Sequence, residues 1–255
     1  MIIVIDVGNT NIVLGAFSEN ALIRSWRLST DFQRSSDETG ILFSHLLSHS
    51  GLQIRDIEAV VVSSVVPQIM FSLERAIKRY LRHTPIIINK NVAKCLNVKT
   101  DNPNEVGADR IVNAVAVHNL YPGDSIIIDF GTATTFCALK ANGDYLGGVI
   151  CPGIKIALDA LIEKTAKLPK IELLRPEKVI GTNTVTSMQS GAIYGYAGQI
   201  ESIVTRMKAE IGEAQVIATG GVASLIKEAT DVIDILDPNL TLKGLKLLYD
   251  MNKNA

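Results

Sequence analysis

Residues 2–17 read IIVIDVGNTNIVLGAF, in which an apolar run ends at an aspartate, a glycine follows, and small amide and hydroxyl residues precede a second apolar run. A buried strand does not need Asp6, and an ordinary turn does not need the whole polar cluster. Residues 126–139, IIIDFGTATTFCAL, repeat the pattern, with Asp129 aligned to Asp6. Two copies in separate halves predict two similar domains, each beginning with a β-hairpin that has a polar tip.

The rest of the chain alternates short apolar runs with segments of helical periodicity, which is typical of an α/β fold. The predicted strands are residues 2–7, 12–17, 22–28, 58–62, 86–88, 125–130, 134–139, 145–150 and 216–218. The predicted helices are residues 39–49, 67–81, 108–120, 152–162, 185–211, 223–229 and 239–249. We place the domain boundary after residue 106, which gives domains of residues 1–106 and 107–255.

The composition favours a globular protein that binds small molecules. Of the 255 residues 47% are hydrophobic, and 25 basic against 26 acidic side chains leave a formal net charge of −1. No block of like charge indicates a nucleic-acid or anionic-membrane surface, and no apolar run approaches the length of a membrane span. The amino terminus lacks a basic flank and is interrupted by Asp6, so we do not expect a signal peptide.

The cysteines and histidines give no local sign of a reactive or metal centre. Cys95, Cys137 and Cys151 are widely spaced, and we interpret them as reduced thiols of a cytoplasmic protein, with a cysteine nucleophile as the alternative. His45 and His49 lie four residues apart on a predicted helix, a spacing that can bind zinc. Because no third ligand follows nearby, a packed or solvated helix face is the favoured interpretation.

The two polar hairpin tips have the chemistry of a phosphate site. Gly8 and Gly131 remove the Cβ that would block a close approach, and successive backbone N–H groups at a tight turn bind anions. Asp6 and Asp129 would repel phosphate directly, but they fit a bound Mg²⁺ that stands between carboxylate and phosphate. One such hairpin alone would be an ordinary turn. Further side-chain donors are available at Asn9, Thr10, Asn11, Thr132, Thr134 and Thr135.

A second small-residue segment, ATGG at residues 218–221, follows a predicted strand. Gly220 and Gly221 would let a flat adenosine pack against the backbone, whereas taken alone they indicate only a turn. The chain contains neither a P-loop pattern nor the GxGxxG pattern of dinucleotide-binding domains. These hairpins therefore predict a nucleotide site of another kind.

Two helix starts are candidates for the substrate site. Asp109 follows Gly107 and stands in the first turn of a predicted helix, where a carboxylate could accept a hydroxyl proton during phosphate transfer. Arg110 could offer two donors to an anionic group. Thr182–Thr184 precede another helix whose exposed amides suit a polar ligand. For both starts the alternative is plain capping of the helix.

Four motifs in order resemble those of the type III pantothenate kinases, over essentially the whole length. The family's D-x-G-N-T corresponds to residues 6–10, G-x-D-R to 107–110, D-x-G-T-A-T to 129–134, and N-T-x-x-x-M-Q-S-G to 183–191. The resemblance implies the actin, sugar-kinase and Hsp70-like fold, with two duplicated ribonuclease H-like domains and a nucleotide cleft between them. It also implies ATP-dependent phosphorylation of pantothenate, the first step of coenzyme A synthesis.

The resemblance further implies a role for each motif. Asp109 would be the general base, Thr132 would contact the ATP phosphates, and Asp129 would hold a monovalent cation, K⁺ or NH₄⁺, beside Mg²⁺–ATP. Thr184 would reach pantothenate from the neighbouring subunit of a homodimer. The remaining ATP contacts would come from Asp6, Val7, Gly8, Asn9, Thr10, Asn11, Ile12 and Val13, and the remaining pantothenate contacts from Gly107, Ala108 and Arg110.

One position departs from the family, and two other functions deserve comparison. Many members have a tyrosine where this chain has Thr100, so an aromatic contact with pantothenate is not expected there. A transcription-accessory regulator on the same scaffold could keep the fold and lose the base, but Asp109 is present and no basic DNA-binding helix is visible. An ATP-hydrolysing chaperone or a phosphatase of the same superfamily is the other alternative, but a chaperone would need a large peptide-binding domain, for which no length remains.

Overall fold

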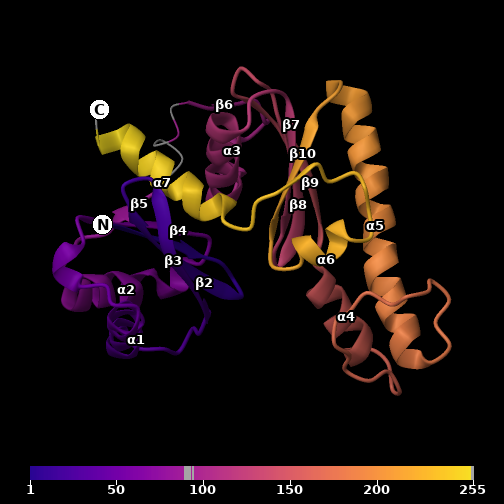
Figure 1. Cartoon of the computed structure of the whole chain (residues 1–255), viewed down its shortest axis with the longest axis horizontal. Helices are drawn as coiled ribbons and strands as arrows, with labels where there is room; N and C mark the ends of the chain where they lie inside the picture. The colour runs from indigo at the N-terminus through magenta and orange to yellow at the C-terminus, as the bar shows by residue number, and fades with distance from the viewer. Residues whose placement is uncertain (89–92, 94, 254–255) are drawn as a thin grey trace. The chain divides into compact units, whose positions relative to one another are not determined.

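The computed structural model describes residues 1–88, 93 and 95–253, and the contacts divide the chain into two units. The first unit combines Met1–Cys95, Asn102–Ala116 and Leu240–Ala255, and the second combines Leu96–Asp101 with Val117–Asn239. This division differs from a single boundary after residue 106, because the last helix packs on the sheet at the start of the chain. Each unit contains one β-sheet (Figure 1).

The sheet of the first unit has the strand order β3-β2-β1-β4-β5. β1 pairs antiparallel with β2 and parallel with β4. Ile3 and Ile5 of β1 belong to a core that includes Phe43 and Leu73 from two helices. Val4, on the opposite face, is also fully buried, which explains why β1 is a continuous apolar run. The strands are β1 (Ile2–Val7), β2 (Asn11–Ser18), β3 (Ala21–Ser29), β4 (Ala59–Ser64) and β5 (Ile86–Ile87).

Helices α1 (Ser36–His49) and α2 (Pro67–Ala76) pack against each other and supply the core on one face of this sheet. Residues 35–38, SSDE, have the sequence pattern of a capping box before a helix, and the structure contains one, because Ser35 and Glu38 exchange hydrogen bonds between side chain and backbone. The predicted helix 67–81 changes character at its end, where Ile77–Leu81 form a π-helical turn that stops at Arg82 with φ 59°.

Helix α7 (Leu240–Lys253) contacts β1, β2 and β4. It also packs against the first half of α3 (Ala108–Leu120), where Thr241 Oγ1 donates to Asn113 Oδ1 at 2.8 Å. The helices approach so closely that a Cβ on Gly244 would lie 2.3 Å from the Val112 carbonyl oxygen. These contacts explain why a helix at the end of the chain belongs to the first unit.

The sheet of the second unit has the order β11-β10-β7-β8-β9-β6. The long helix α5 (Thr184–Ile211) runs along this sheet (Figure 1), and its Ile193, Ile200 and Val204 pack with Ile126 and Ile128 of β7. The strands are β6 (Asn97–Val98), β7 (Ser125–Phe130), β8 (Ala133–Leu139), β9 (Asp144–Pro152), β10 (Gln215–Gly220) and β11 (Ile235–Leu236), with α4 (Ile154–Glu163) and α6 (Ala223–Lys227) as the further helices.

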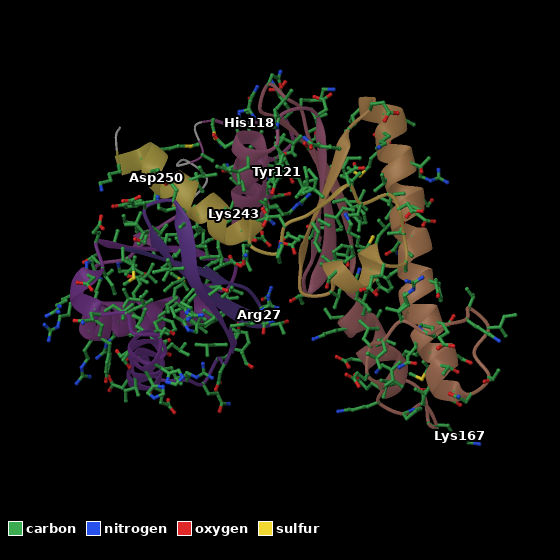
Figure 2. The ribbon with its side chains drawn as sticks, in the orientation of Figure 1. Arg27, His118, Tyr121, Lys167, Lys243 and Asp250 are labelled. Carbon is green, nitrogen blue, oxygen red and sulfur yellow. The ribbon has the colours of Figure 1, made fainter. Side chains whose placement is uncertain are left out.

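A polar contact fixes the end of α3 within the second unit. Tyr121, labelled in Figure 2, donates its hydroxyl proton to Asp237 Oδ2 at 2.8 Å. Burial and this hydrogen bond raise the pKa of Tyr121 from 10.0 to about 12. Tyr121 is therefore neutral over the physiological pH range, and it remains a donor to Asp237.

The two sheets share five strands with the same order and directions. β3-β2-β1-β4-β5 of the first unit corresponds to β9-β8-β7-β10-β11 of the second, and β6 is an addition at one edge. In both sheets the first two strands are antiparallel neighbours, and the first strand pairs in parallel with the strand after the hairpin. The predicted α/β fold with duplicated halves is therefore confirmed.

Candidate nucleotide and substrate sites

The two predicted hairpins have the same pattern of burial. In β1 and in β7 five of the six residues are buried, and the half-buried exception is the aspartate, Asp6 or Asp129. Asp6 pairs with Val13 on β2, and Asp129 pairs with Thr135 on β8. Because strand residues alternate between faces, Asp6 lies on the face opposite Ile3 and Ile5, and Asp129 lies on the face opposite Ile126 and Ile128. The repeat read from the sequence is therefore a repeat in three dimensions.

The hairpin loops differ in length by one residue. In the first, Gly8 N–H donates to Asn11 O at 3.0 Å, and Asn9 and Thr10 at the tip are exposed. In the second, Gly131 N–H donates to Ala133 O at 3.1 Å, which leaves a shorter tip at Thr132. Both glycines thus close their loops through backbone hydrogen bonds.

A small hydroxyl residue lies beside each aspartate on the neighbouring parallel strand. Ser63 of β4 pairs with Asp6, and Thr219 of β10 pairs with Asp129. Ser63 is fully buried and its hydroxyl has no hydrogen-bond partner among the described residues. An unsatisfied hydroxyl beside a carboxylate at a strand end is costly, and it suits a bound polar group. Ser63 has no local signal in the sequence, because two serines at the end of an apolar run are unremarkable.

Gly220 and Gly221 lie at the end of β10, next to the second hairpin. Gly220 has φ +100°, and a Cβ there would lie 2.6 Å from the Phe130 backbone. Gly221 N–H donates to Phe130 O at 3.2 Å. The geometry therefore requires glycine at position 220 for strand packing, whether or not an adenosine binds there.

Asp109 lies in the first turn of α3, as predicted, and its carboxylate folds back over the helix start. Its Oδ1 accepts a hydrogen bond from Arg110 N–H at 2.8 Å. A Cβ on Gly107 would lie 2.5 Å from the same oxygen, so glycine there leaves room for the carboxylate. Residues 107–110 are all half-buried, so the carboxylate is fixed in orientation and still reachable.

Thr184 begins α5 beside an open cavity of about 670 Å³ within the second unit. Asn183 caps the helix, since its side chain accepts from Thr186 N–H at 2.9 Å. Capping therefore accounts for Asn183 but not for Thr184, whose side chain is exposed at the cavity. The cavity has polar and apolar walls, formed by Ala157, Leu158, Leu161, Leu168, Gly181, Thr182, Asn183, Thr184, Ser187, Met188, Gly191, Ala192 and Tyr196.

The rest of the fourth motif fixes the segment between α4 and α5. Gln189 Nε2 donates to Glu172 O at 2.9 Å, and the Ser190 hydroxyl donates to Val179 O. One turn further along α5, the Tyr194 hydroxyl donates to Pro176 O at 3.0 Å. Lys167, labelled in Figure 2, lies in the same segment. The motif thus positions a long connection, a role that the sequence did not reveal.

The remaining candidates do not form a metal centre. Among the described residues there is no group of three or more histidine, cysteine, aspartate or glutamate side chains able to hold a metal ion. His45 and His49 stack with ring centroids 6.1 Å apart. Cys137 is buried, where it accepts a hydrogen bond from the Tyr145 hydroxyl at 3.3 Å. No described helix is long and apolar enough to cross a bilayer.

A family model described as type III pantothenate kinase matches residues 2–206 of the chain. The match covers most of the sequence, and all four motifs lie inside it. The chain belongs to the type III pantothenate kinase family.

Solved structures with little sequence identity share the fold of this type III pantothenate kinase family member. A conserved Campylobacter jejuni protein, described as a candidate Baf family transcriptional activator, has a TM-score of 0.61 at 18% identity, with 99% of this chain and 100% of that chain covered. The activator of 2-hydroxyisocaproyl-CoA dehydratase from Clostridium difficile has a TM-score of 0.55 at 16% identity, with coverages of 98% and 95%. The ROK hexokinase from Thermus thermophilus has a TM-score of 0.53 at 13% identity, with coverages of 100% and 99%. They support the duplicated, actin-like fold.

Thr100, where the sequence is expected to depart from the family pattern, lies two residues after β6 in the second unit. Its Oγ1 is buried without a hydrogen-bond partner among the described residues. Its methyl group lies beside Gly147, at 3.5 Å from where a Cβ would stand. Gly147 has φ +117°, a conformation that disfavours any larger residue. Thr100 therefore packs within the second unit against β9.

We predict that Gly153→Ala displaces the second hairpin. Gly153 has φ −71°, which alanine tolerates, but its Cβ would lie 2.3 Å from Thr132 O and 2.6 Å from Gly131 O. Overpacking of this kind costs about 1–3 kcal/mol, to be measured by urea unfolding. Gly198→Ala in α5 is the matched control, because among the described residues no atom outside the adjacent helix lies within 4 Å of the added Cβ, and alanine favours a helix. A Gly153→Ala variant as stable as the wild type would contradict the prediction.

Proposed function

We propose that the protein is an ATP-dependent pantothenate kinase, which forms 4′-phosphopantothenate in the first step of coenzyme A synthesis. The observation that carries the proposal is the family match over residues 2–206, which contains all four motifs. The duplicated hairpins with equivalent aspartates support ATP as the phosphate donor. Phosphoryl transfer needs placement and charge neutralisation more than covalent chemistry, and these residues are suited to both tasks.

Each hairpin would bind a different part of Mg²⁺–ATP. Residues Asp6–Val13 would bind the nucleotide, and Thr132 would contact its phosphates. Asp6 would hold Mg²⁺ and Asp129 the monovalent cation, K⁺ or NH₄⁺, both of which neutralise phosphate charge when bound. The buried hydroxyl of Ser63 beside Asp6, which has no hydrogen-bond partner among the described residues, fits this donor set. The backbone N–H groups of the loop tips would act as further phosphate donors.

Asp109 would be the general base that accepts the hydroxyl proton of pantothenate. Its carboxylate is held by Arg110 N–H, which leaves the second oxygen for the substrate hydroxyl. Gly107, Ala108 and Arg110 would complete the pantothenate contacts. Exclusion of water from the reacting groups would direct transfer to the alcohol instead of to water.

The direct test is a coupled ADP-release assay with and without pantothenate, with pantetheine and simple sugars as competing acceptors. Rapid ADP release that depends on pantothenate would support the proposal, and a product mass increased by one phosphoryl group would identify the acceptor. ADP release with sugars alone would assign the protein to another kinase specificity. The alternative of a non-catalytic transcription-accessory regulator predicts no ADP release with any acceptor, and the kinase family match does not favour it.

We also propose a homodimer in which Thr184 reaches the pantothenate site of the neighbouring subunit. Seven of the fifteen exposed large hydrophobic side chains among the described residues fall between positions 150 and 185. Val179 and Ile180 are 63% and 83% exposed although Ser190 fixes their segment. Exposed apolar side chains on a fixed segment favour burial against a second copy. The other five are Ile150, Ile156, Leu161, Leu174 and Val185.

We predict that Ile180→Asp weakens the dimer. Burial of a new charge and loss of an apolar contact at an interface typically cost about 2–4 kcal/mol, or roughly 30- to 1000-fold in the dissociation constant. Light scattering across a dilution series measures the change. Phe71→Asp is the matched control, since Phe71 is 74% exposed and belongs to the first unit. If both variants remain dimeric like the wild type, the interface lies elsewhere.

Mixing inactive subunits tests whether the sites are shared. Asp109→Asn and Thr184→Ala each damage a different component, so mixed dimers should regain part of the activity if the components come from two subunits. No recovery in verified mixed dimers would mean that each subunit has a self-contained site.

A further inference from the structure

The first hairpin loop is held by a residue that none of the four motifs contains. Thr30 follows the last residue of β3, and its hydroxyl donates to Gly8 O at 2.6 Å. Its backbone N–H donates to Thr10 O at 2.9 Å. Thr30 therefore binds the carbonyl oxygens of the residues on either side of Asn9. We propose that Thr30 is a positioning residue for nucleotide binding, which rests on the proposed function of this loop.

Both accepted carbonyls belong to peptide groups whose N–H atoms are candidates for phosphate binding. The carbonyl of Gly8 shares a peptide plane with the N–H of Asn9, and the carbonyl of Thr10 shares one with the N–H of Asn11. A donor on the carbonyl oxygen fixes the orientation of the plane and polarises the N–H at its other end. Thr30 therefore aligns and strengthens two donors of an anion-binding loop.

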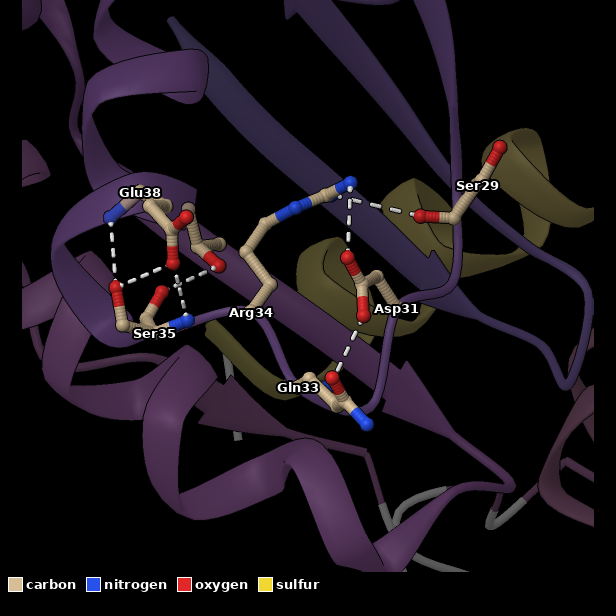
Figure 3. A network of polar contacts seen from close by, with 7 residues as sticks. Ser29, Asp31, Gln33, Arg34, Ser35 and Glu38 are labelled. Carbon is tan, nitrogen blue, oxygen red and sulfur yellow. Dashed lines mark hydrogen bonds and ion pairs between the residues drawn. The ribbon is translucent and has the colours of Figure 1, made fainter.

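The segment that carries Thr30 is itself fixed by a polar network (Figure 3). The Arg34 guanidinium donates to Ser29 O at 3.5 Å and lies 3.8 Å from an Asp31 oxygen, so it contacts both chain neighbours of Thr30. Gln33 N–H donates to Asp31 Oδ1 at 2.9 Å. The capping box that starts α1 begins directly afterwards. A donor on a fixed segment loses little entropy when it holds the loop.

The second unit contains the equivalent backbone hydrogen bond, but no side-chain hydroxyl accompanies it. Gly153 follows the last residue of β9 as Thr30 follows the last residue of β3, and its N–H donates to Thr132 O at 3.1 Å. A side chain at position 153 would overlap the Thr132 carbonyl, because a Cβ there would lie 2.3 Å from Thr132 O. The first loop is one residue longer, which leaves space for a side chain and a second carbonyl to bind. The hydroxyl of Thr30 is thus an addition specific to the first hairpin.

The test compares Thr30→Val, Thr30→Ser and Thr39→Val by calorimetric binding of Mg²⁺–ATP to the full chain. Valine keeps the shape and the backbone N–H but removes the hydroxyl, and serine restores it. Thr39 is the matched control, because its hydroxyl donates to Ser35 O at 3.0 Å in the same unit. We expect Thr30→Val to weaken ATP binding about five- to tenfold, the equivalent of one net hydrogen bond. Thr30→Ser and Thr39→Val should stay within about twofold of the wild type.

Kinetic constants separate positioning from general destabilisation. Thr30→Val should raise the KM for ATP and leave the KM for pantothenate unchanged. Wild-type affinity in Thr30→Val, equal weakening in Thr39→Val, or no rescue by serine would each overturn the proposal. If the wild type binds ATP but does not phosphorylate pantothenate, pantothenate is not the acceptor. The role of Thr30 would still be decided by the ATP affinities of the variants. A wild type that does not bind Mg²⁺–ATP would overturn both.

Discussion

Asp109→Asn should lower kcat by about 10²- to 10⁴-fold while the protein still folds and binds ATP, since that is the usual contribution of a positioned general base. Asparagine has the size of aspartate, and its oxygen can still accept from Arg110 N–H, as the carboxylate does at 2.8 Å. It cannot accept the substrate proton. The loss should therefore appear in kcat, measured by ADP release at saturating ATP and pantothenate.

Asp37→Asn is the control for a change at a helix start. Asp37 occupies the first turn of α1 as Asp109 occupies the first turn of α3. If Asp109 only caps its helix, its replacement should cost about 0.5–2 kcal/mol of stability and leave kcat close to that of Asp37→Asn. Near-wild-type turnover of Asp109→Asn would remove this carboxylate from the proton transfer.

The elements that the sequence predicts best are those with a local signal. The apolar run, aspartate and glycine of each hairpin are contiguous, so strands β1 and β7 have the predicted bounds. The capping box at Ser35 is also contained in four residues. The two-residue strands β6 and β11 were missed, because such short runs have no period to detect.

The remaining features depend on contacts between distant parts of the chain. The hydrogen bond from Thr30 to Gly8 O spans 22 residues, and that from Thr241 to Asn113 spans 128. Neither donor lies in a recognisable motif, because a threonine that binds a carbonyl looks like any other threonine. Ser63 is recognisable only once β4 is placed beside β1. The sequence therefore predicts the chemistry of the loops. The contacts that fix the loops in place become visible only when the strands are paired.

Asp6→Asn and Asp129→Asn should affect different cations, although the two residues occupy equivalent strand positions with the same partial burial. If Asp6 holds Mg²⁺, its replacement should raise the Mg²⁺ concentration for half-maximal activity. It should also lower kcat/KM for ATP by about 10²- to 10³-fold, as expected for several kcal/mol of lost metal stabilisation. Asp129→Asn should instead abolish the difference in activity between K⁺ and Na⁺ that the wild type is expected to show.

Each variant is the matched control of the other, because both exchange the same carboxylate for an amide at the end of a buried central strand. A general defect of folding or packing would change both cation dependences together. A changed Mg²⁺ dependence in Asp6→Asn alone and a changed K⁺ dependence in Asp129→Asn alone would mean that the two equivalent hairpins bind different ions. An unchanged ratio of K⁺ to Na⁺ activity in Asp129→Asn would exclude that carboxylate as the monovalent site. An unchanged Mg²⁺ dependence in Asp6→Asn would exclude Asp6 as a metal ligand, and the nucleotide would then depend on the backbone N–H groups of the loops.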